Sequence, residues 1–236
     1  MNMLFRCGQH LLAVIALSIV ITLSVHACPE SKITVAGGHF PPYSYIDRYS
    51  KKCIGSLVQE LEQLIDTLGY HVDSFCAPSA RIYQMIDNGQ VDLTINTKST
   101  KLLKDNVTFL PLKMTDFSLS LYQSIEADDV KVIAGVRGYS YGGKRQEFID
   151  DGFVFIDFPD TESSTRFFLT GRAKYLMAYD EPFNFYVNSR EMIPKIAYRK
   201  SLLSKEGAYI AVSTKSDLHD ALVTQFSSLA GTKPKN

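Results

Sequence analysis

From Ile33 onward, short apolar runs alternate with segments whose apolar residues recur at helical spacing, and this alternation constrains the fold more than any other feature. Three of the runs have the length of strands: residues 33–37 (ITVAG), 70–75 (YHVDSF) and 91–95 (VDLTI). Two helical segments lie between them, residues 55–69 and 80–89, and each ends on a glycine, a frequent stop signal. Strand–helix–strand alternation predicts parallel strands with helices packed on the sheet.

A second unit of the same kind starts near Val130. Its predicted strands are residues 130–136, 153–158 and 175–179. A turn followed by a helix is expected over residues 138–152, and a further helix over residues 161–172 with Thr161 as its N-cap. Residues 117–124 (FSLSLYQS) join the two units as an extended connector.

After the second unit the chain is expected to return to the first. Residues 207–213 (GAYIAVS) read as a strand and residues 216–230 as a capped amphipathic helix. The predicted fold class is α/β, with two lobes joined by extended segments and a cleft between them. We expect hinge motion at residues 118–122 and 209–213. Ligands prefer such interfaces and the carboxyl ends of parallel strands.

Residues 1–27 have the pattern of a signal peptide. Arg6 supplies a positive start, residues 11–23 (LLAVIALSIVITL) an apolar core, and VHA small residues at a cleavage position before Cys28. A retained membrane anchor is the alternative, but the run is short for a span and polar sequence follows it at once. We therefore expect a mature protein outside the cytoplasm.

Cysteine usage bears on the same compartment. Cys7 leaves with the signal peptide, so that Cys28, Cys53 and Cys76 remain in an oxidising environment. One arrangement pairs Cys53 with Cys76 and leaves Cys28 as a lipidated first residue, because VHAC loosely resembles a bacterial lipobox. The other is a secreted protein with one spare thiol. Three cysteines do not fix the pairing.

Composition excludes one class of partner. The 236 residues, 45% of them hydrophobic, suffice to bury one or two compact cores. The chain has 25 basic and 25 acidic side chains and a formal net charge of zero, with its lysines and arginines scattered. A nucleic-acid partner requires a basic patch, so we expect none.

Polar side chains follow the third predicted strand, in residues 96–104 (NTKSTKLLK). They supply amide, hydroxyl and ammonium groups, from Asn96, Thr97, Lys98, Ser99, Lys101 and Lys104. Hydroxyls at a strand end can hydrogen-bond a small polar solute, and a lysine can bind a carboxylate. The alternative is a helix start with Thr97 or Ser99 as the N-cap.

Two further segments lie where the cleft is expected. Residues 136–143 (VRGYSYGG) end a strand and open a helix with glycines, so their N–H groups can receive an anion. The segment matches no nucleotide fingerprint, and a simple turn is the alternative. Phe40, Tyr43 and Tyr45 follow the first strand, where a ring can stack on a ligand or pack into the core.

Asp180 follows the predicted strand 175–179 directly. An ionised carboxylate beside a core is costly unless a partner satisfies it. The sequence therefore predicts a cationic or hydrogen-bonding partner for Asp180.

No catalytic motif is present. The sequence has no nucleophile elbow, no HExxH and no CxxC. The histidines outside the signal segment, His39, His71 and His219, do not share metal-ligand spacing. We expect no cofactor, no metal and no enzymatic activity.

Taken in order, these motifs resemble the extracytoplasmic solute-binding proteins of family 3, which serve polar amino-acid uptake. The resemblance covers residues 33–229 and is carried by HFPPYSYI, GSLVQELEQLIDTLGY, ARIYQMIDNGQVDLTI, VRGYSYG, FFLTGRAKYLMAYDEP and GAYIAVSTKSDLHDAL. It implies the two-lobe type II periplasmic binding fold, each lobe a mainly parallel sheet flanked by helices. Lobe 1 would comprise residues 28–122 and 204–236, and lobe 2 residues 123–203.

The resemblance also implies ligand contacts. The stacking aromatic of the family falls on Phe40, its hydroxyls after the third strand on Thr97 and Ser99, and the hydroxyl of its glycine turn on Ser140. Its acidic residue, which receives the ligand α-ammonium, falls on Asp180. This assignment implies that Asp180 is satisfied by a cation of the ligand.

The sequence departs from the family at the carboxylate clamp. The family arginine falls on Lys104, or on a neighbouring residue after a one-residue slip. Lysine cannot form a planar bidentate pair with a carboxylate. Arg81 is a second candidate for that role, although Ser79 stands where an aromatic residue is usual. The resemblance implies an amino-acid ligand, with a peptide-like compound, a polyamine or another cationic metabolite as alternatives.

The expected function is therefore a periplasmic solute-binding protein that delivers a small polar ligand to an ABC permease or a sensor. The first alternative is an enzyme on the same scaffold, such as a dehydratase with Asp180, His39 or Lys98 as acid and base. The second is a module that binds no solute and acts through protein contacts.

Overall fold

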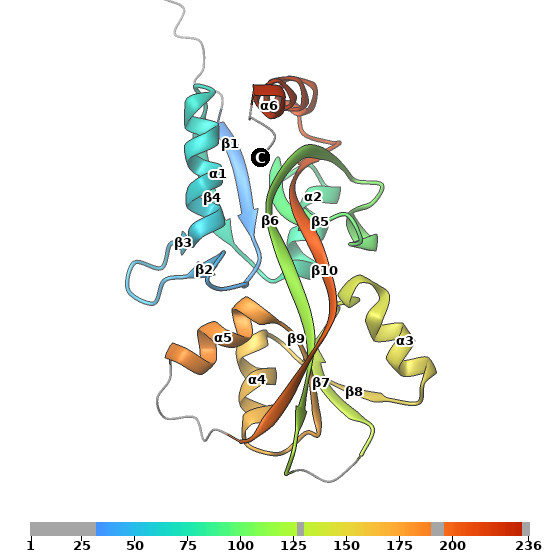
Figure 1. The fold of residues 1–236 in the computed structure, drawn as a ribbon. Coiled ribbons are helices and arrows are strands. Elements are labelled where there is room, and N and C mark those ends of the chain that lie inside the picture. Colours follow the sequence, from blue (N-terminus) through green and yellow to red (C-terminus); the bar gives the residue numbers. More distant parts are fainter. Residues whose placement is uncertain (1–31, 127–129, 190–195, 233–236) are drawn as a thin grey trace, which may run out of the picture. The chain divides into compact units, whose positions relative to one another are not determined.

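The computed structural model describes residues 32–126, 130–189 and 196–232. The predicted signal peptide and Cys28 lie outside the described residues. The described chain forms one eight-stranded sheet, in the order β4-β1-β5-β10-β6-β9-β7-β8, together with a small two-stranded hairpin (Figure 1).

Two parallel triplets make up the ends of the sheet. The first triplet contains β1 (Lys32–Gly37), β4 (His71–Cys76) and β5 (Leu93–Thr97). The second contains β7 (Val132–Val136), β8 (Val154–Phe158) and β9 (Tyr175–Tyr179). In each triplet the strand that comes first in sequence lies in the middle, as expected for strand–helix–strand units.

Two long strands join the triplets. β6 (Val107–Ser124) and β10 (Tyr198–Ser213) pair with each other in antiparallel fashion along most of their length. β10 also pairs with β5, and β6 with β9, so this ribbon connects the two ends of the sheet. The predicted lobe boundaries at residues 122/123 and 203/204 fall inside these two strands.

The first triplet is covered by helices on both faces. α1 (Ser56–Thr67) and α6 (His219–Thr232) pack on one face around Leu61, Leu222 and Phe226. α2 (Ser79–Asp87) packs on the other face through Ile82 and Ile86. The helical spacing predicted for residues 55–69 is confirmed, because α1 buries Leu57, Leu61 and Ile65.

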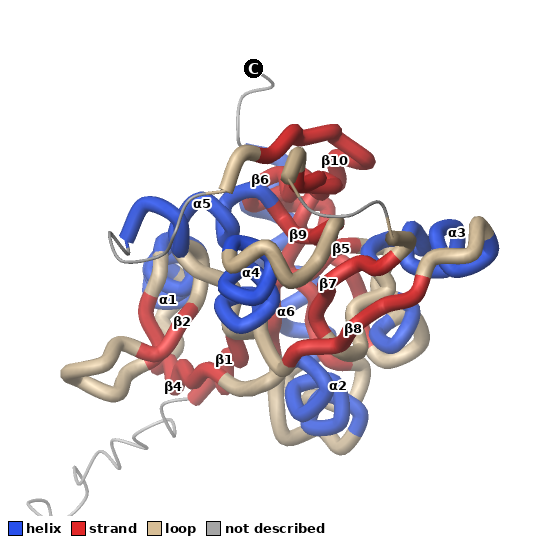
Figure 2. Tube along the Cα trace, turned by 90° about the horizontal axis from the view of Figure 1, so that it is seen from below, coloured by secondary structure: helices blue, strands red, loops and turns tan. Residues whose placement is uncertain are grey.

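The second triplet lies between other helices. Figure 2 shows α4 (Thr161–Leu169) and α3 (Lys144–Asp150) on opposite sides of β7. Adjacent residues of β7 serve the two faces, since Ala134 packs in the cluster of α4 and Ile133 in that of α3. The N-cap predicted at Thr161 is wrong: the helix starts there, and Asp160 is the cap, because its carboxylate accepts a hydrogen bond from the Ser163 N–H at 2.7 Å.

The remaining elements are short. The hairpin β2 (Tyr45–Ile46) and β3 (Cys53–Ile54) precedes α1, and a disulfide joins Cys53 to Cys76 of β4. This confirms the Cys53–Cys76 alternative for that pair. The 3₁₀ turns η1 (Lys101–Leu103) and η2 (Tyr141–Gly143) follow β5 and β7. The helix α5 (Asp180–Ser189), which was not among the predicted elements, follows β9.

Candidate functional site

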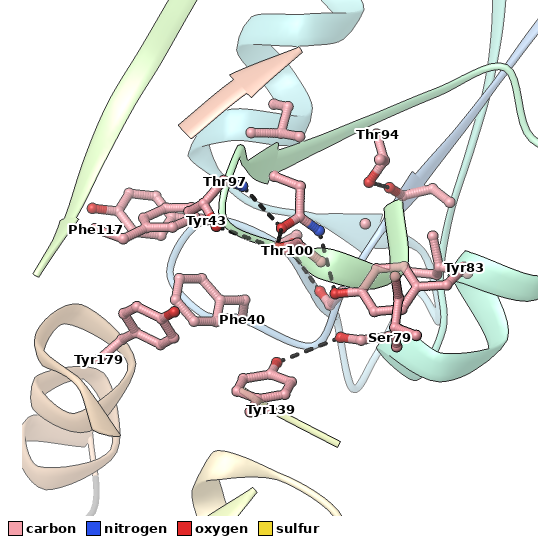
Figure 3. Close-up of a pocket in the computed structure, with 18 of the residues that line it drawn as sticks. Phe40, Tyr43, Ser79, Tyr83, Thr94, Thr97, Thr100, Phe117, Tyr139 and Tyr179 are labelled. Atoms are coloured by element: carbon pink, nitrogen blue, oxygen red, sulfur yellow. Dashed lines mark hydrogen bonds between the residues drawn. The ribbon is translucent and has the colours of Figure 1, made fainter. Parts of the chain in front are cut away.

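A cavity lies where the carboxyl ends of the two triplets meet, and residues of both triplets line it (Figure 3). The first triplet contributes the segment after β1, the start of α2 and the segment after β5. The second contributes residues 138–142 after β7 and Tyr179 at the end of β9. This placement agrees with the rule that ligands bind beyond the carboxyl ends of parallel strands.

One wall of the cavity is aromatic. The Phe40 ring centroid lies 4.8 Å from that of Phe117 on β6 and 5.1 Å from that of Tyr179. Tyr139 continues the wall, with its centroid 6.5 Å from that of Tyr179. The spacing and tilt of these rings are those of favourable edge and offset contacts, so the wall is a packed unit.

The opposite wall is a chain of hydrogen bonds. The Thr100 hydroxyl donates to Asn96 Oδ1 at 2.7 Å, and Asn96 Nδ2 lies 3.4 Å from the Tyr83 hydroxyl. Thr97 Oγ1 lies 3.2 Å from the Thr100 hydroxyl and 3.0 Å from that of Ser99. These groups are neutral: the hydroxyls can donate or accept, and the Asn96 amide has one donor and one acceptor end, so the wall suits the polar groups of a ligand.

This series of hydrogen bonds ends on a carboxylate. Ser99 Oγ donates a short hydrogen bond to Glu206 Oε2 of β10. Glu206 is not among the lining residues. Its two neighbours Ser99 and Gly142 do line the cavity.

The tyrosines of the cavity stay protonated. Burial raises the pKa of Tyr139 to about 12 and also raises the pKa of Tyr141 and Tyr179. Their hydroxyls therefore remain hydrogen-bond donors at physiological pH. Tyr139 uses its hydroxyl across the cavity, 3.5 Å from Ser79 Oγ.

Solved structures with the same arrangement exist. The sensor domain of a histidine kinase, described as similar to periplasmic binding proteins, superposes with a TM-score of 0.68 at 17% identity, over 84% of this chain and 89% of that one. The arginine-bound form of truncated ArgBP from T. maritima gives 0.67 at 17% identity, over 86% and 97%. The chain has the fold of the periplasmic binding proteins.

Further comparisons bear on fold alone. A protein described as the binding component of an ABC transporter from Wolinella succinogenes, complexed with lysine, gives a TM-score of 0.66 at 13% identity, over 85% of this chain and 91% of that one. No family model and no curated protein matches the sequence. The predicted fold class is confirmed by these structures, and the ligands named are those of the neighbours.

Four of the predicted ligand contacts lie around the cavity of this binding-protein fold. Phe40, Thr97, Ser99 and Ser140 all line it. They come together because each lies at or just beyond the carboxyl end of a parallel strand. Their contact with a ligand remains a prediction.

Two predicted cations lie elsewhere. Arg81 on α2 and Lys104 after η1 are exposed, and neither is among the lining residues. Lys101, at the start of η1, is a cationic residue that does line the cavity. The expected carboxylate clamp is thus not assembled by either residue in this structure.

Asp180 has partners within the chain. Its Oδ2 lies 2.6 Å from Lys200 Nζ of β10, and its Oδ1 accepts a hydrogen bond of 2.8 Å from the Tyr122 hydroxyl of β6. Asp180 is buried, starts α5 and does not line the cavity. The predicted need for a cation is met by Lys200, so the expectation that a ligand ammonium satisfies Asp180 is not required by this structure.

The residues considered for catalysis do not line the cavity either. His39 Nε2 lies 2.9 Å from the Tyr186 hydroxyl of α5, and Lys98 Nζ lies 4.2 Å from the ring centroid of Tyr209. Each therefore already has a partner other than a bound substrate.

Three lining residues were not among those predicted from the sequence: Tyr83, Tyr139 and Tyr179. A usable signal existed for two of them, because Tyr139 and Tyr179 stand at the carboxyl ends of predicted strands. The sequence held no such signal for Tyr83, because the direction of its side chain depends on how α2 packs on the sheet.

The described residues contain neither a metal-binding cluster nor a helix suited to crossing a membrane. No group of three or more His, Cys, Asp or Glu side chains there is arranged to hold a metal ion. Within the same residues, no helix is both long and apolar enough to cross a membrane.

Proposed function

We propose that this chain is a non-enzymatic solute-binding protein that holds a small polar molecule of amino-acid size between the two triplets of its sheet. The observation that carries the proposal is the cavity itself. It is formed jointly by both triplets, has an aromatic wall and a hydrogen-bonding wall, and lies at the site favoured for ligands in open α/β sheets.

The structural neighbours support the proposal. Those described above are bound to arginine or lysine or belong to a sensor, and an ancestral arginine-binding protein has been solved with glutamine. Together with the sequence motifs, they favour membership of solute-binding family 3. Phe40, Thr97, Ser99 and Ser140 are the ligand contacts that we propose.

The proposed location is extracytoplasmic, after export by residues 1–27, with lipid attachment at Cys28 as an alternative to free secretion. The proposed partner is either an ABC permease or a sensor protein. Both uses occur among the neighbours, one described as an ABC transporter component and one as a histidine kinase sensor domain.

The test is thermal unfolding of the exported full chain against a broad panel of amino acids, deaminated amino acids, polyamines, sugars and dipeptides. A ligand present at about 100 times its dissociation constant should stabilise the protein by about 2.7 kcal/mol. Calorimetric titration of each hit gives its stoichiometry, expected as one molecule per chain.

Recovery of the hit separates binding from catalysis. After long incubation, a binding protein returns the compound unchanged, whereas a dehydratase returns a product. No stabilising compound across the panel would count against solute binding and favour a module that acts through protein contacts.

A further inference from the structure

The charge of the cavity lining is one-sided. Among the described residues that line it, no side chain is acidic, and Lys101 is the sole charged one. A ligand ammonium buried in this cavity would therefore meet hydroxyls, an amide and aromatic rings, but no lining carboxylate. An ammonium without an ionic partner is costly to bury.

Asp180 and Glu206, two carboxylates near the site, have partners within the chain. Asp180 pairs with Lys200 and Tyr122 and lies outside the lining. Glu206 accepts the hydrogen bond of Ser99 and packs against Gly142. Neither one is among the lining residues, so the ammonium of a free amino acid has no lining carboxylate as its partner.

The aromatic wall favours a ring instead. Phe40, Phe117, Tyr139 and Tyr179 place ring faces and edges around one side of the cavity (Figure 3). Such surfaces bind planar rings through offset and edge contacts. The hydroxyls and the Asn96 amide on the opposite wall can hydrogen-bond a ring substituent or a carboxylate.

We propose that the ligand is a monoanionic aromatic carboxylate that carries no ammonium group. The aromatic wall holds its ring, and Lys101 is the cation that offsets its negative charge. This inference rests on the proposed function and narrows the ligand class of the same site.

Matched compounds test it directly. 3-Phenylpropanoate, 3-(4-hydroxyphenyl)propanoate and indole-3-propanoate differ from phenylalanine, tyrosine and tryptophan by the ammonium group alone. Calorimetric titration of the full chain is expected to show at least one propanoate binding at least about tenfold more tightly than its amino acid, because the ammonium would be buried unpaired.

Lysine variants test the role of Lys101. Lys101→Met is expected to weaken the propanoate by at least about tenfold, through loss of a charge-assisted contact. Lys101 and Lys104 are both exposed, but only Lys101 lines the cavity, so Lys104→Met is the matched control and should leave the dissociation constant within about twofold.

Other outcomes overturn the inference. Amino acids that bind as tightly as the propanoates, with binding lost in Glu206→Gln, would assign an ammonium site to Glu206. Propanoates that fail to bind, while another compound of the broad panel does, would leave solute binding intact and refute this ligand class. Failure of every compound would count against both proposals.

Discussion

The Asp180 carboxylate is buried at the start of α5, yet both of its oxygens have partners. Lys200 Nζ and the Tyr122 hydroxyl lie within 2.6 and 2.8 Å. The helix N-terminus adds a favourable field for a negative charge at this position. The cost of burying the carboxylate is thus offset by groups of the same chain.

Removing the cation should reveal that cost. Lys200→Met leaves Asp180 buried with one hydrogen bond and no counter-charge. Because the Lys200 side chain is 45% exposed, we expect a loss of about 1–2 kcal/mol in urea unfolding, less than for a fully buried pair. In the pair Lys32–Asp73 both partners are more than half exposed, so Lys32→Met should cost about 0–1 kcal/mol.

Equal losses in the two variants would contradict the buried role of the Asp180–Lys200 pair. A ligand-binding role of Asp180 predicts something different. In that case Asp180→Asn would abolish ligand binding, whereas our assignment predicts that it lowers stability and leaves the dissociation constant within about tenfold, about 1.4 kcal/mol.

Glu181, the next residue, gives a pH-dependent prediction. Burial raises its pKa above the ordinary value of 4.5, with the charge of Asp180 as a further cause, and its Oε2 is buried without a hydrogen-bond partner. The folded protein therefore binds this proton more tightly than the unfolded chain does. The resulting stability is present below pH 4.5 and is lost as pH rises through the folded-state pKa.

Glu181→Gln should consequently raise the melting temperature at pH 7, because the variant never carries the buried charge. The difference from the parent should shrink as the pH falls toward 4.5. Thermal unfolding from pH 4 to 8 measures it. Glu126→Gln serves as a control at an exposed position, and a pH-independent difference in Glu181→Gln would refute the assignment.

At the scale of residues, the sequence shows that Asp180 needs a cationic partner but not which residue is that partner. Asp180 after an apolar strand was recognisable as a residue that requires a cation. Lys200 was not recognisable as that cation, because its position depends on the register that pairs Lys200 with Tyr122 across β10 and β6. Strand register over long separations is not encoded in local pattern.

At the scale of elements, β6 and β10 extend well beyond their predicted parts, residues 117–124 and 207–213. β10 begins at Tyr198 and includes the polar segment 199–206 (RKSLLSKE). This segment lacks the alternation of a half-buried strand and has an exposed, lysine-rich composition. It is a strand because β6 pairs with it, which is a tertiary effect that outweighs intrinsic propensity.

The disulfide tethers a hairpin whose strands are very short. β2 and β3 have two residues each, and the Cys53–Cys76 bridge ties this hairpin to β4 across a separation of 23 residues. A cross-link of this span removes entropy from the unfolded chain. We expect the double variant Cys53→Ala/Cys76→Ala to lose about 3 kcal/mol in urea unfolding.

Reduction provides the control for that measurement. Dithiothreitol should lower the stability of the parent to near that of the double variant, and should not change the double variant. If reduction destabilised both proteins equally, the loss would not come from this bridge.

At the scale of the molecule, side-chain contacts join the two ends of the sheet. Tyr45 of β2 packs on Phe185 of α5 with ring centroids 5.4 Å apart. His39 Nε2 lies 2.9 Å from the Tyr186 hydroxyl, and the Phe40 ring contacts that of Tyr179. In the proposed function, these contacts would form when the lobes close on a solute.

The two-lobe fold was predictable because its evidence is local and repeated. Each triplet has its own strand–helix–strand pattern, and strand ends place Phe40, Thr97, Ser99 and Ser140 at the cavity. The charged contacts were less predictable, since Arg81 and Lys104 are long side chains on exposed positions. Their direction depends on packing and solvent, which a motif does not specify.

Gly142 gives a test of closure. It has φ 64°, and a Cβ added there would overlap Glu206 Oε1, on the ribbon that joins the two triplets. Gly138 in the same segment has φ 78°, and a Cβ added there meets nothing within 4 Å. Alanine at either position carries a similar backbone strain of about 1 kcal/mol, so a clash with Glu206 is the difference between the two variants.

Both glycines line the cavity, and we expect Gly138→Ala and Gly142→Ala to lose similar stability, with Gly142→Ala, in which the Glu206 side chain has to move, binding ligand more weakly than Gly138→Ala. Small-angle scattering with a ligand from the panel should show the parent and Gly138→Ala contracting on binding, and Gly142→Ala contracting less. Equal affinities and equal contraction would mean that the approach of Gly142 to Glu206 is no part of closure. The lobes would then have to close through the aromatic contacts around Phe40 and Tyr179.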